Sequence, residues 1–176
     1  MSRRWCDKIE AMIKITRLLL LFSLFTATAD AIEPPAQEMQ VTHSVIKMRL
    51  APSVTIQDAA EAMLSKAANL NLALVGRQHP SKALQNRGID SPHIEIFQFC
   101  NPEDAAKMVR HDIIYAAYMP CRIALVEDNH GMVWLTTLNL NMMIAKSDLP
   151  DEIYRIAVST NTKIMTIMTA GANGDF

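Results

Sequence analysis

The sequence predicts an α+β fold of two layers, in which helices cover one face of an antiparallel sheet. Three observations lead to this prediction. Short apolar stretches with strand character are separated by segments with helical spacing. Neighbouring strand candidates are joined as hairpins, whereas the helical segments are set apart from them. The chain has 176 residues, of which 50% are apolar, and this suits one folded domain and excludes a disordered chain.

The first 31 residues have the pattern of a secretory signal peptide. Two basic residues, Lys14 and Arg17, precede an apolar run over 18–25, and small residues follow up to Ala29-Asp30-Ala31. The apolar run is shorter than the roughly 20 residues that a membrane-spanning helix needs. We therefore expect cleavage after Ala31 and a periplasmic or secreted protein. The alternative is an uncleaved membrane anchor.

The remaining chain is divided into a leader, one domain and a tail. Residues 32–40 contain adjacent prolines and no periodicity, which predicts a flexible leader. The predicted domain spans 41–171, and 172–176 form a C-terminal tail. Its first element is a strand over 41–50, closed by Pro52.

A helix is predicted from Ser53 onward, with apolar residues at helical spacing as far as Ala67. Its start is indicated by Thr55-x-x-Asp58, the pattern of a capping box. Two strands follow, over 72–75, where Gly76 closes the run, and over 94–99. The polar stretch 77–93 between them is predicted to be a loop, with or without a helical turn at 81–86.

The last third of the chain predicts a short helix, a hairpin and a long helix. Asn101-Pro102-Glu103-Asp104 is a strong helix start, because Asn caps, Pro suits the first helical position and carboxylates favour the N-terminus. Strands over 121–127 and 132–138 are joined by a hairpin loop at 128–131. The final helix is opened by Asp148 and Pro150 and ends at Gly171.

Cys100 and Cys121 are predicted to lie at one edge of the sheet, because one ends a strand and the other begins the next. In an oxidising compartment we expect a structural disulfide between them, or two buried apolar cysteines. A redox or sulfur-transfer pair is the alternative. Cys100 directly precedes a helix N-terminus, where the helix dipole would stabilise a thiolate.

The segment FCNPEDAAKMVRHDIIYAAYMPCRIALVED resembles the domain-of-unknown-function 302 family. The matching residues are Cys100, Asn101, Pro102, Pro120, Cys121 and Glu127, and the resemblance extends over about residues 41–142. The chain departs from the family pattern at Tyr118-Met119 and at Arg122. The resemblance implies a small α+β domain, similar in shape to the TATA-binding-protein-like fold but without its DNA binding. It implies no established activity.

These patterns predict a binding protein rather than an enzyme. The chain has 17 basic and 18 acidic residues, so nucleic acid is not an expected partner. It has no nucleophile elbow, phosphate loop or dinucleotide fingerprint. We expect a small ligand or a partner, including a second copy of the chain, to bind near Asn101, Pro120 and Cys121.

The alternatives are a thiol-based redox or sulfur-handling protein and a periplasmic copper or haem binder. Copper is suggested by 12 Met and 5 His, with Met142-Met143 and Met165-x-x-Met168 as the closest pairs. Core packing is the favoured explanation of the Met165 and Met168 pair, because Met at helical spacing usually fills a core. The histidines lack metal-binding spacing and are expected at the surface or in loops: His43, His79, His93, His111 and His130.

Overall fold

A computed structural model describes residues 43–176. The predicted signal peptide and leader lie outside the described residues. In chain order the elements are β1 (Val45–Arg49), α2 (Ile56–Asn69), β2 (Ala73–Gln78), α3 (Pro80–Gln85), β3 (Ile94–Cys100), α4 (Pro102–His111), the 3₁₀ helix η2 (Ile113–Tyr118), β4 (Cys121–Glu127), β5 (Val133–Leu138), α5 (Leu140–Ala145) and α6 (Asp151–Asn173).

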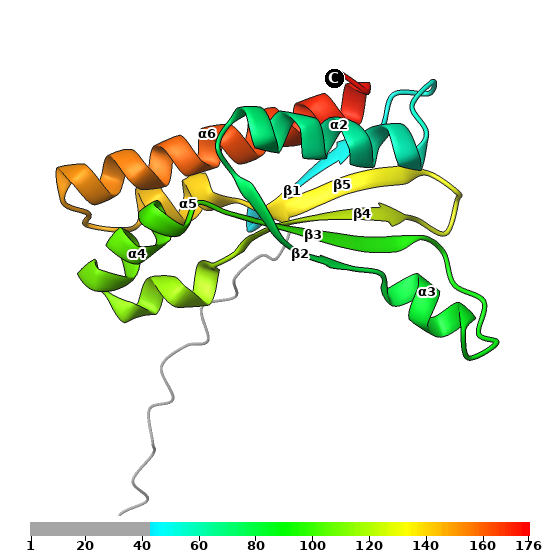
Figure 1. The fold of residues 1–176 in the computed structure, drawn as a ribbon, viewed down its shortest axis with the longest axis horizontal. Coiled ribbons are helices and arrows are strands. Elements are labelled where there is room, and N and C mark those ends of the chain that lie inside the picture. The colour runs from blue at the N-terminus through cyan, green and yellow to red at the C-terminus, as the bar shows by residue number, and fades with distance from the viewer. Residues whose placement is uncertain (1–42) are drawn as a thin grey trace, which may run out of the picture. The chain divides into compact units, whose positions relative to one another are not determined.

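The five strands form one sheet in the order β1-β5-β4-β3-β2, and every neighbouring pair is antiparallel. Helices α2 and α6 lie side by side across one face of this sheet (Figure 1). The predicted α+β fold of an antiparallel sheet with helices is therefore confirmed. Helices α4 and α5 lie at one end of the sheet and α3 at the other (Figure 1).

The core lies between the sheet and the two long helices. Residues that alternate along a strand point to the same face, and the inward positions in the middle of the three inner strands are buried. Helices α2 and α6 add residues at helical spacing. The fully buried large apolar side chains are Met63, Phe97, Phe99, Ile123, Leu125, Leu135, Ile164, Ile167 and Met168.

The local start signals are confirmed by the structure. Thr55 and Asp58 form the predicted capping box of α2, in which each side chain accepts a hydrogen bond from the other residue's backbone N–H. Asn101 caps α4 by accepting hydrogen bonds from the backbone N–H groups of Glu103 and Asp104. The helical turn suggested for 81–86 is present as α3.

Two predicted ends were wrong. β2 does not stop at Gly76 but continues to Gln78, with a register shift between Leu74 and Gly76. α6 does not end at Gly171. It continues to Asn173, and Gly174, at φ +71°, caps it in the left-handed conformation.

Candidate functional site

The segment that links β3 to β4 helps to enclose a site at one end of the sheet. The chain leaves β3 at Cys100, forms α4 and η2, and returns at Cys121. The Asn101 side chain joins this link to the end of α2, because its Nδ2 donates a hydrogen bond to the Asn71 carbonyl over 3.3 Å. The Met119–Pro120 peptide bond that leads back to the sheet is cis. The two motif cysteines therefore lie at the same edge, as predicted.

The expected disulfide is absent from the structure, in which Cys100 and Cys121 are both free thiols. Cys121 is paired with Phe99 across the β3–β4 ladder, and Cys100 is paired with Ala73 of β2. The two cysteines thus occupy successive positions at the sheet edge rather than directly opposed ones. Because of this offset of one residue, the two cysteines lie near each other at the ends of their strands but do not form a directly opposed cross-strand pair. Their spacing in the sequence does not reveal the offset.

A cavity of about 400 Å³ opens between this edge of the sheet and the surrounding helices. Cys100, Asn101 and Cys121 line it, whereas Pro102 and Pro120 are not among its lining residues. Most of the wall is apolar, and it comes from α4, η2, α5 and the first half of α6. The polar exceptions besides Asn101 are Asp104, Tyr115, Tyr118, Lys146, Ser147 and Thr160. A concave and largely apolar site with a few polar groups is typical of small-molecule binding.

The cavity environment keeps both thiols protonated at neutral pH. Burial raises the pKa of Cys100, and the nearby Asp104 carboxylate raises it further. Burial also raises the pKa of Cys121, to about 11, with a smaller contribution from Cys100 and an opposing one from Arg122. The expectation that the α4 dipole would give Cys100 a depressed pKa was therefore wrong, because burial and the Asp104 carboxylate both raise this pKa.

The family model described as "Domain of unknown function DUF302" matches residues 47–171. The chain belongs to the DUF302 family. The described fold is also similar to the crystal structure of an uncharacterised conserved DUF302 protein from Bacillus stearothermophilus, with a TM-score of 0.60 and 16% sequence identity. The similarity covers 72% of this chain and 96% of that one. Among curated proteins, none matches the chain.

Sequence reasoning missed two walls of the cavity in this DUF302 domain. η2 contributes Ile114, Tyr115 and Tyr118, and α5 contributes Leu140 together with the Met142-Met143 pair. Both helices have only 6 residues, so neither shows a clear helical period. The cap residues could have indicated where these two helices begin. The Asp112 and Asn139 side chains accept hydrogen bonds from backbone N–H groups in the first turns of η2 and α5.

The histidines and the Met165 and Met168 pair, weighed from the sequence as metal ligands, do not line the cavity of the DUF302 fold. Met168 is completely buried in the core, as core packing predicted, and no histidine is among the residues that line the cavity. Within 43–176 there is no group of three or more His, Cys, Asp or Glu side chains placed to hold a metal ion. No helix in the same range is long and apolar enough to cross a membrane.

The raised thiol pKa values give a direct prediction for alkylation. In Cys6→Ser/Cys100→Ser, which retains Cys121, the iodoacetamide rate should rise about tenfold per pH unit from pH 7 to 9, because only the thiolate reacts. The same variant unfolded in urea should react much faster at pH 7.5. A rate for the folded protein that levels off below pH 8 would show a stabilised thiolate and contradict the prediction.

Proposed function

We propose that this DUF302 domain binds a small, predominantly apolar molecule in the cavity beside Cys100 and Cys121. The observation that carries the proposal is the cavity of about 400 Å³, whose wall is mostly apolar. Apolar surface that remains exposed inside a cavity is unfavourable in water, and an apolar ligand would remove it from solvent. Asn101, Asp104 and Lys146 supply the few polar groups that would orient such a ligand.

The two protonated thiols fit this function better than redox chemistry. A thiol with a raised pKa behaves as a small apolar group and a weak nucleophile, whereas thiol–disulfide exchange requires a thiolate. Cys100 and Cys121 would therefore serve as parts of an apolar wall.

The ligand proposal predicts that filling the cavity abolishes binding. The lining residue Ala157 lies on α6 and is half-buried, and a phenyl ring at this position would occupy the cavity. We expect wild-type protein to enhance the fluorescence of 1-anilinonaphthalene-8-sulfonate, and Ala157→Phe to bind the dye at least about tenfold more weakly, a loss of about 1.4 kcal/mol.

Ala68→Phe is the matched control, because Ala68 is exposed on α2 and does not line the cavity. This variant should bind the dye as the wild-type protein does. Equal binding by all three proteins would show that the dye binds elsewhere. No binding by the wild-type protein, together with no shift in melting temperature from a panel of apolar compounds, would refute the proposal.

A second candidate function, binding of Cu(I), rests on a different observation. Six of the residues that line the cavity carry sulfur: Cys100, Met108, Met119, Cys121, Met142 and Met143. Thiolates and thioethers are the soft ligands that Cu(I) prefers. The copper hypothesis from the sequence relied on scattered Met and His, whereas the fold gathers Met142-Met143 and both described cysteines around one space.

Cu(I) binding would displace the thiol protons, so its affinity should rise with pH. We expect anaerobic titration against a chromophoric chelator to show tighter binding at pH 8.5 than at pH 6.5. Cys100→Ser/Cys121→Ser should lose this binding, whereas Cys6→Ser should keep it. Binding that survives in the double variant, or that is absent from the wild-type protein, would refute the Cu(I) candidate.

A further inference from the structure

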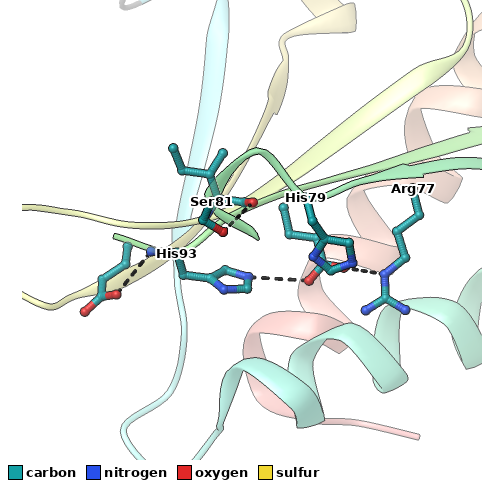
Figure 2. A network of polar contacts seen from close by, with 7 residues as sticks. Arg77, His79, Ser81 and His93 are labelled. Carbon is teal, nitrogen blue, oxygen red and sulfur yellow. Dashed lines mark hydrogen bonds and ion pairs between the residues drawn. The ribbon is translucent and has the colours of Figure 1, made fainter. Parts of the chain in front are cut away.

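Four side chains form a polar cluster at the end of the sheet that carries α3. Its centre is Glu95 of β3, which is only 2% exposed. The Arg77 guanidinium forms an ion pair with Glu95 through Nε and Oε1. His79 Nε2 lies 2.7 Å from Oε1 of the same carboxylate, and His93 Nε2 lies 3.4 Å from Oε2 (Figure 2).

The β2–β3 ladder explains why these residues meet. Gln78 pairs with Ile96, so His79 and Glu95 occupy the next positions on the two antiparallel strands. Glu95 shares its strand face with Phe97 and Phe99, which accounts for its burial. In the sequence, the signal for this cluster was an acidic residue within an apolar strand. The two histidines lie in loops, as predicted.

The same cluster anchors α3. Ser81, in the first turn of α3, donates a hydrogen bond from Oγ to the Ile94 carbonyl over 3.1 Å and accepts one from the Ile94 N–H over 3.2 Å (Figure 2). His79 is the residue immediately before the helix. Contacts at both His79 and Ser81 therefore hold the start of α3 against β3.

The charge balance of the closed cluster favours a neutral His79 ring. One buried carboxylate is already paired with Arg77, so protonating His79 adds positive charge that has no second anion beside it in the cluster. From α3, Lys82 adds to the repulsion at His79. From β4, the carboxylate of Glu127 accepts a hydrogen bond from the His93 backbone N–H over 3.3 Å.

Hydrogen bonding favours a neutral His79 ring too. His79 Nδ1 is buried and makes no hydrogen bond within the described structure. An imidazolium has two N–H donors, so a protonated ring here would bury an unsatisfied donor. Burial lowers the pKa of His79, and this outweighs the opposing attraction of Glu95.

We propose that Arg77, His79, His93 and Glu95 form an acid-sensitive latch that holds α3 on the sheet at neutral pH and releases it when His79 is protonated. A histidine whose pKa is lower in the closed state stabilises that state above its ordinary value of about 6.5. The stabilisation is lost as the pH falls through and below this value. The cluster is remote from the cavity, so the latch acts independently of ligand or Cu(I) binding.

Hydrogen exchange of the full chain at pH 7.5 and 5.5, corrected for intrinsic exchange rates, tests the latch. The reporters are the Ala83 and Asn86 amides, which donate the α3 hydrogen bonds to the carbonyls of His79 and Lys82. We expect their protection to fall by about tenfold per proton taken up for each unit of pH below the imidazole pKa. Amides in the centre of α6 should change far less.

Two variants separate the latch from general acid sensitivity. His79→Gln removes the titrating group and should abolish the loss of protection between pH 7.5 and 5.5. His111→Gln, at an exposed position on α4, should retain the wild-type response. Unchanged α3 protection in the wild-type protein, or an equal loss in His79→Gln, would overturn the proposal.

Discussion

Phe97→Ala should reduce the free energy of unfolding by about 3–5 kcal/mol, the usual cost of deleting a buried aromatic ring. Phe97 is completely buried on the inner strand β3. Its ring stacks against Phe99 with a centroid separation of 6.3 Å, and the Arg77 guanidinium lies 4.9 Å from its centroid. The substitution would therefore leave a cavity and remove an aromatic and a cation–π contact.

Urea denaturation followed by circular dichroism measures this loss. Phe176→Ala makes the same side-chain deletion at a residue that is 67% exposed, and it should change the unfolding free energy by less than about 0.5 kcal/mol. Similar values for the two variants would show that β3 does not hold Phe97 in the core. Because a loss of 5 kcal/mol approaches the total stability of many domains, Phe97→Leu provides a milder substitution at the same position.

Gly171→Val should destabilise the domain by about 1–3 kcal/mol, through overpacking rather than through the loss of a contact. A Cβ atom at Gly171 would lie 2.5 Å from Met63 Cγ, 3.1 Å from Leu135 Cδ1 and 3.2 Å from the Ala59 carbonyl oxygen. Met63 can adjust its rotamer, but the Ala59 carbonyl belongs to the backbone of α2. The absence of a side chain at Gly171 thus permits the close packing of α6 against α2.

The matched control is Thr169→Val, which introduces the same side chain at an exposed position of α6, two residues away. Its effect should stay within about 0.5 kcal/mol. If Gly171→Val were as stable as this control, α2 and α6 would have to pack less closely than the structure shows.

Local chemistry explains which parts of the fold were predictable. Capping at Thr55 and Asn101 and the hairpin over 128–131 depend on contacts within a few residues, so their patterns are visible in the sequence. Strands β3, β4 and β5 were equally predictable, because short apolar runs bounded by turn residues are typical of buried strands.

Contacts between distant segments determine the features that the sequence did not reveal. Gly171 appeared to be a helix end because glycine commonly follows a C-terminus, whereas its role comes from α2, more than 100 residues earlier. The cavity was predicted only as an edge near Asn101 and Cys121, because its other walls come from η2, α5 and α6. The register that separates Cys100 from Cys121 is likewise a property of pairing in the sheet.

The walls of the cavity differ in how firmly the rest of the fold holds them, and helix α6 is held firmly. The helix has 23 residues and a length of about 35 Å, and its second half is fixed in the core while Ile156, Ala157 and Thr160 of its first half face the cavity. The wall on α6 is thus part of a helix that is anchored in the core. Another wall, η2, is a single short helix whose Ile113 is 80% exposed. The ligand that we propose would therefore contact an anchored wall on α6 and a less firmly packed wall on η2.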